Sequence, residues 1–118
     1  MSRASTVLIV DDDEDFRSAL GEMLEGEHCR VLSAQNGKRA LEMLEAIRPD
    51  LIVADLMMPV MNGWELSAEL EKNELLKDIP VVILSGVARF RPLGRARVLS
   101  KPFGLSALVA LLDIADTP

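Results

Sequence analysis

The chain has 118 residues, 49% hydrophobic and 27% charged, with a formal net charge of −6. We expect one globular domain over residues 1–118, because this length and composition suffice to bury a core. The negative charge argues against general nucleic-acid binding, and no apolar run approaches the roughly 20 residues that cross a bilayer. A lone cysteine, Cys29, excludes an internal disulfide and, with no signal-peptide pattern near the start, predicts a cytoplasmic location.

The first half of the chain alternates apolar runs with helical patterns. Residues 7–10 (VLIV) are apolar and β-branched, which predicts a buried strand. Apolar side chains recur at helical spacing over residues 16–24, and residues 29–33 (CRVLS) predict the second strand. A second helical stripe covers residues 41–47 and is broken at Pro49.

The same alternation continues in the next segment. Residues 51–54 (LIVA) predict a third strand, and the methionine-rich residues 57–63 (MMPVMNG) predict a loop. Apolar positions one turn apart over residues 66–70 predict a third helix. Residues 81–84 (VVIL), which follow a proline, predict the fourth strand.

The last part of the chain is less regular. Residues 98–99 predict a short fifth strand, and residues 105–112 predict a closing helix. Pro92 and Gly94 lie between the fourth and fifth strands, and both disfavour helix. We therefore expect the fourth helix to be short or irregular.

Strands that alternate with helices predict a doubly wound α/β fold. Each crossover carries its helix back across a parallel sheet, so helices cover both faces. In such a sheet, ligands bind beyond the carboxyl ends of the strands. The polar residues that follow the apolar runs are therefore candidate site residues: Asp11, Asp12, Asp55, Ser85 and Lys101.

The acidic candidates predict a metal site. Asp11, Asp12 and Asp55 would repel one another at a shared rim, and a hard divalent cation such as Mg²⁺, which takes oxygen ligands, relieves that repulsion. One alternative is that the acidic run only starts a helix, where carboxylates favour the positive end of the helix dipole. That alternative suits the acids after Asp12 but leaves Asp55 unexplained.

A calcium-binding loop is another alternative for the acidic run. Asp11, Asp13, Asp15 and Glu22 have the spacing of such a loop. Phe16 stands where that loop needs a glycine, and the run follows a strand rather than a helix. These two features argue against the calcium loop.

Four segments in order, VLIVDDDEDFR, DLIVADLMMPVMNG, VVILSG and LSKPF, resemble the receiver domain of bacterial two-component response regulators. The resemblance covers residues 6–112. It implies a flavodoxin-like, five-stranded parallel sheet of strand order 2-1-3-4-5. It also implies a phosphoacceptor signalling domain rather than an enzyme. We expect this domain to be a stand-alone receiver.

The resemblance assigns a role to each site residue. Asp55 is then the phosphoacceptor, which takes a phosphoryl group from a histidine kinase or a histidine phosphotransfer protein. Asp11, Asp12, Asp55 and the backbone carbonyl of Met57 are the expected Mg²⁺ ligands. Lys101, followed by Pro102 as in the family, is expected to pair with a phosphoryl oxygen.

Ser85 takes the family's Thr/Ser position, where the hydroxyl binds another phosphoryl oxygen. The sequence departs from the family in this region, since the interval from Ser85 to Lys101 is short and Val98 replaces the usual aromatic switch residue. These departures favour one alternative function, a receiver-fold docking module that acts without phosphorylation. A metal-dependent phosphatase is a further alternative, because Asp11-x-Asp13 resembles an aspartate-nucleophile hydrolase motif.

The interval before Lys101 is also rich in arginine. It contains Arg89, Arg91, Arg95 and Arg97. They form either a solvated face or a docking patch for an acidic partner, because the planar guanidinium binds carboxylates bidentately. Nucleic acid is a weaker hypothesis for this patch, given the overall negative charge.

Overall fold

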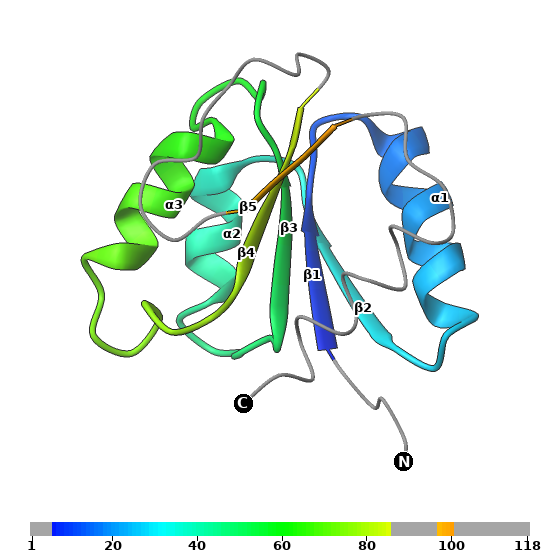
Figure 1. The fold of residues 1–118 in the computed structure, drawn as a ribbon, viewed down its shortest axis with the longest axis horizontal. Coiled ribbons are helices and arrows are strands. Elements are labelled where there is room, and N and C mark those ends of the chain that lie inside the picture. Colours follow the sequence, from blue (N-terminus) through cyan, green and yellow to red (C-terminus); the bar gives the residue numbers. More distant parts are fainter. Residues whose placement is uncertain (1–5, 86–96, 101–118) are drawn as a thin grey trace.

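The computed structural model describes residues 6–85 and 97–100, and five parallel strands form its central sheet (Figure 1). The strands are β1 (Thr6–Val10), β2 (Arg30–Ala34), β3 (Leu51–Asp55), β4 (Val81–Ser85) and β5 (Arg97–Ser100). Their order in the sheet is β2-β1-β3-β4-β5, and every neighbouring pair is parallel. The predicted α/β fold and strand order are confirmed.

The described helices cover both faces of the sheet. They are α1 (Glu14–Glu25), α2 (Gly37–Met43) and α3 (Gly63–Glu71). Helix α1 lies against one face, whereas α2 and α3 lie together against the other (Figure 1). Among these helices, none is both long and apolar enough to span a membrane.

The side chains of β1 divide between two apolar cores. Leu8 and Val10 belong to the core shared with α2 and α3, whereas Val7 and Ile9 belong to the core shared with α1. All four are at most 1% exposed, because successive side chains of a central strand point to opposite, covered faces. Truncating a buried leucine such as Leu8 to alanine would cost about 2–5 kcal/mol of stability.

Two predicted boundaries differ from the structure. The second strand begins at Arg30, because the Cys29 N–H donates to the carbonyl of Leu24 and closes the turn after α1 (3.2 Å). The second helix ends at Met43 rather than at Ile47, as residues 44–46 tighten into turns before the break at Pro49.

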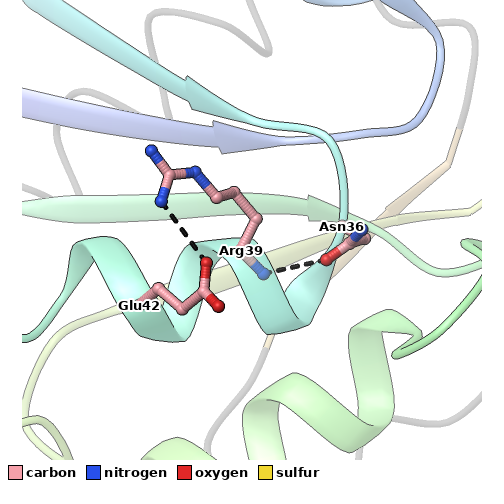
Figure 2. A network of polar contacts seen from close by, with 3 residues as sticks. All are labelled: Asn36, Arg39 and Glu42. Carbon is pink, nitrogen blue, oxygen red and sulfur yellow. Dashed lines mark hydrogen bonds and ion pairs between the residues drawn. The ribbon is translucent and has the colours of Figure 1, made fainter.

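Helix α2 is stabilised at its start by polar contacts (Figure 2). The side chain of Asn36 accepts a hydrogen bond from the Arg39 N–H (2.8 Å), so that Asn36 caps the helix. The Arg39 guanidinium in turn pairs with Glu42 one turn further on (3.3 Å). Both side chains are more than half exposed, so this pair contributes little to stability.

Several further sequence predictions concern residues outside the described part. The closing helix over residues 105–112, the segment with Pro92 and Gly94, and Lys101 with Pro102 all lie there. So do three of the four arginines of the predicted docking patch, and the fourth, Arg97, begins β5. These interpretations stay predictions.

Candidate functional site

Three aspartates meet at the carboxyl ends of β1 and β3. The two strands are neighbours, with Val10 opposite Ala54, so Asp11 just beyond β1 is level with Asp55 at the end of β3. Asp11, Asp12 and Asp55 each offer a carboxylate oxygen, and these oxygens lie within 4.8 Å of one another. The convergence of the three acidic residues, predicted from the strand ends, is therefore confirmed.

The three carboxylates differ in their access to solvent. Asp11 is buried, at 1% exposed, whereas Asp55 is partly buried and Asp12 is exposed. Clustered anionic oxygens repel one another unless a cation neutralises them. A set of carboxylate oxygens reached from solvent on one side suits Mg²⁺, which binds one or two carboxylates and keeps several waters.

The loop after β1 is held by hydrogen bonds to Asp11. The Asp11 N–H donates to the carbonyl of Ala34 at the end of β2 (3.1 Å), and the Asp13 N–H donates to Asp11 Oδ1 (2.9 Å). Arg17 Nη1 donates to the backbone carbonyl of Asp11 (2.6 Å). Arg17 was not identified from the sequence, because an arginine on an amphipathic helix is most often a solvated surface residue.

The remaining acids of the run start α1. Asp13 is the N-cap, its side chain accepting from the Phe16 N–H (3.1 Å), and Glu14 and Asp15 lie in the first turn. The prediction that these acids begin a helix is confirmed. The calcium-loop alternative is wrong, since residues 14–22, most of the segment that would form the loop, are helical.

The loop after Asp55 returns closely to the strand that carries it. The Gly63 N–H donates to the carbonyl of Leu56 (3.0 Å), and a Cβ on Gly63 would lie 2.8 Å from the backbone oxygen of Asp55. Only glycine permits this approach. Asn62 and Glu65 form a capping box at the start of α3, so this helix begins at a fixed position beside the site.

The methionines of this loop have different environments. Met58 and Met61 pack against the core, whereas Met57 is 71% exposed. Val60 is also exposed and has a φ of 69°, a left-handed conformation that is strained for a β-branched residue. The backbone carbonyl of Met57 as a metal ligand stays a prediction.

The other candidate residues lie on or beyond neighbouring strands. Ser85 ends β4, which pairs with β3 so that Leu84 is opposite Asp55, and its backbone therefore lies at the same rim. Val98 lies in β5 opposite Ile83. Lys101 follows the end of β5 and lies outside the described residues. The chemical roles of Ser85 and Lys101 stay predictions.

Comparisons with known proteins agree with this architecture. A family model described as "Response regulator receiver domain" matches residues 7–113. The chain is 41% identical over 109 residues to the protein-glutamate methylesterase/protein-glutamine glutaminase of Treponema pallidum, which covers 83% of this chain. The chain spans only part of its curated relatives, namely 26%, 51% and 32% of the length of three of them.

Solved structures show the same fold. The signal receiver domain of a histidine kinase from Syntrophus aciditrophicus has a TM-score of 0.87 at 29% identity, over 95% of this chain and 89% of that one. The chemotaxis response regulator CheY4 of Vibrio cholerae has a TM-score of 0.84 at 28% identity, over 95% and 98%. Sequence and fold therefore point to the same family.

Proposed function

Because the chain belongs to the response regulator receiver domain family, we propose that it accepts a phosphoryl group from a phosphohistidine donor onto Asp55. The observation that carries this proposal is the cluster formed by Asp11, Asp12 and Asp55, whose carboxylate oxygens lie within 4.8 Å of one another. A cluster at the end of adjacent central strands is where a parallel α/β sheet binds ligands.

In this proposal, Asp11, Asp12 and Asp55 hold Mg²⁺, with the Met57 carbonyl as a further ligand. The donor set supports this assignment, because all of these groups are hard oxygen ligands. The ion, when bound, neutralises charge on the phosphoryl oxygens, so that an anionic nucleophile can approach an anionic donor.

The transfer forms one bond and breaks another. A carboxylate oxygen of Asp55 attacks phosphorus, the phosphorus–nitrogen bond to the donor histidine breaks, and the imidazole takes up the bonding electrons as it leaves. The product is an acyl phosphate on Asp55. Lys101 pairs with a phosphoryl oxygen as a point charge, and Ser85 donates a hydrogen bond to another.

The partner that this chemistry requires carries a phosphorylated histidine. We propose a histidine kinase or a histidine phosphotransfer protein, which the domain meets in the cytoplasm. The domain is then a phosphoacceptor module that assists its own phosphorylation, not an enzyme with a separate substrate.

One sequence feature favours a second function, a docking module that acts without phosphorylation. Val98 lies in β5 at the position where the family carries its aromatic switch residue. A domain without that switch needs another route from Asp55 to its output surface, or needs no phosphorylation. Binding of an acidic partner through Arg89, Arg91, Arg95 and Arg97 is the corresponding expectation.

Intact mass spectrometry after incubation with acetyl phosphate tests the primary proposal. We expect one phosphoryl adduct on the wild type with Mg²⁺, and none with a chelator or in Asp55→Asn. Asp50→Asn is the matched control, because Asp50 precedes the same strand at its opposite end and accepts a hydrogen bond from the Thr6 N–H (2.8 Å).

The other outcomes identify the alternatives. Absence of an adduct with acetyl phosphate and with a panel of histidine kinases would favour the docking module. Steady turnover of a phosphate ester in the absence of a kinase would instead indicate the metal-dependent phosphatase.

A further inference from the structure

Arg17 of α1 contacts the backbone between two carboxylates of the site. Its Nη1 donates to the backbone carbonyl of Asp11 over 2.6 Å, in a partly buried position. That carbonyl belongs to the peptide unit that joins Asp11 to Asp12, and a peptide unit is planar. Holding the carbonyl therefore restricts rotation of this peptide plane, that is ψ of Asp11 and φ of Asp12, and so the directions in which the two side chains leave the backbone.

The contact from Arg17 adds to other hydrogen bonds that hold Asp11. The Asp11 N–H is bound to the end of β2 through Ala34, and its Oδ1 accepts from the Asp13 N–H. Without Arg17, the sheet and the loop would still hold the N–H and the carboxylate of Asp11. The peptide unit that leads to the exposed Asp12 would lose this hydrogen bond from α1.

We propose that Arg17 is a positioning residue for the Mg²⁺ site, which orients the Asp11–Asp12 peptide so that both carboxylates face Asp55. This inference rests on the metal site of the proposed function. A guanidinium suits the role because it stays charged and its hydrogen bonds to an acceptor are stronger than those between neutral groups. Contacts that orient metal ligands typically change metal affinity by about 10- to 100-fold.

Charge and geometry predict opposite effects of removing Arg17. A positive side chain near a cation site repels the cation, so neutralising Arg17 would tighten Mg²⁺ binding if charge alone mattered. Loss of the link to the Asp11 carbonyl would instead loosen the site and weaken binding. The direction of the change in Kd therefore separates the two effects.

Calorimetric titration with Mg²⁺ tests the inference on the wild type, Arg17→Gln, Arg17→Lys and Arg39→Gln. We expect Arg17→Gln to raise the Kd by roughly 10-fold or more, and Arg17→Lys, which keeps the charge but not the planar fork, to raise it less. Arg39→Gln is the matched control, because it removes the same charge from a different helix, α2, where Arg39 pairs with Glu42 (Figure 2). It should keep the wild-type Kd.

Urea unfolding without Mg²⁺ and far-UV circular dichroism establish that each variant is folded. If Arg17→Gln is folded and binds Mg²⁺ as tightly as the wild type or more tightly, the inference is overturned. If Arg17→Gln does not fold, Arg17→Lys decides. A Kd for Mg²⁺ higher than that of the wild type supports the inference, and a wild-type Kd overturns it. A wild type that binds no Mg²⁺ would overturn the proposed metal site itself, so the two failures are distinguishable.

Discussion

Asp12 is the exposed member of the three-aspartate cluster, so its charge can be removed with little effect on packing. We expect Asp12→Asn to be at least as stable as the wild type without Mg²⁺, because one repelling charge is lost. The Kd for Mg²⁺ should rise by roughly 10-fold or more, because removing even a residue that only orients a metal ligand weakens metal affinity by that factor.

Calorimetric titration and urea unfolding check this prediction. Asp15→Asn is the matched control, because it removes the same charge from the first turn of α1, outside the cluster. An unchanged Kd in Asp12→Asn would contradict the assignment of Asp12 as a ligand.

We expect Met57 to lengthen the lifetime of an acyl phosphate on Asp55. It is apolar and 71% exposed, two positions after Asp55, and Val87, outside the described residues, is apolar as well. Neither side chain can orient a water molecule for attack on phosphorus. We expect slow loss of the adduct after acetyl phosphate is removed, followed by intact mass, and faster loss in Met57→Asn. Rapid loss from the wild type without a phosphatase would contradict this.

At the scale of residues, the sequence predicted the cluster but not its support. Asp11, Asp12 and Asp55 were identifiable because each follows a strand, and parallel strands end at one rim. The contact between Arg17 and the Asp11 carbonyl depends on the path of the loop, which apolar periodicity does not encode.

Two glycines of similar burial lead to opposite predictions at the scale of elements. A Cβ on Gly63 would lie 2.8 Å from the backbone oxygen of Asp55, so α3 or the end of β3 must shift. A Cβ on Gly21 would lie 3.5 Å from Val31 Cγ1, an ordinary contact inside α1. We expect Gly63→Ala to lower the free energy of unfolding by about 1–3 kcal/mol and to slow phosphorylation of Asp55.

Gly21→Ala is the matched control for this comparison. It should raise the free energy of unfolding by up to about 1 kcal/mol, because alanine is a better helix former. Urea unfolding measures both values. Equal stability of the two variants would contradict the close approach of α3 to β3.

The elements themselves were largely predictable, because their apolar patterns are strong. All five strands occur where apolar runs predicted them, and the first three helices start after residues with capping side chains. The residues at which these elements begin and end were less predictable. The stripe that reaches Ile47 is apolar at helical spacing, yet α2 ends at Met43, since local turns before Pro49 replace regular helical bonds.

At the scale of the whole molecule, the strand order determines the site. Strands β1 and β3 are neighbours in the sheet. Their pairing alone therefore brings together aspartates that are far apart in sequence. Helices α1 and α3 then fix the two segments that follow these strands. This topology could be predicted from alternating elements, because right-handed crossovers leave few arrangements.

Mg²⁺ that binds only the folded chain should stabilise the whole domain. Mass action predicts about 2.7 kcal/mol when the free Mg²⁺ concentration is 100 times the Kd. We expect the midpoint of thermal unfolding to rise with Mg²⁺ in the wild type and to rise less in Asp12→Asn. NaCl at the same ionic strength is the control, and an equal shift with NaCl would show that general screening, not a site, causes the effect.

Reductive trapping tests whether Asp55 is the residue that accepts the phosphoryl group. Borohydride reduces an acyl phosphate to an alcohol, so phosphorylated protein treated in this way and digested would carry homoserine at the modified aspartate. Peptide mass spectrometry should find homoserine at position 55 alone, and only when Mg²⁺ was present. Homoserine at position 11 or 12, or a phosphoryl group that survives on another residue, would show that Asp55 is not the phosphoacceptor.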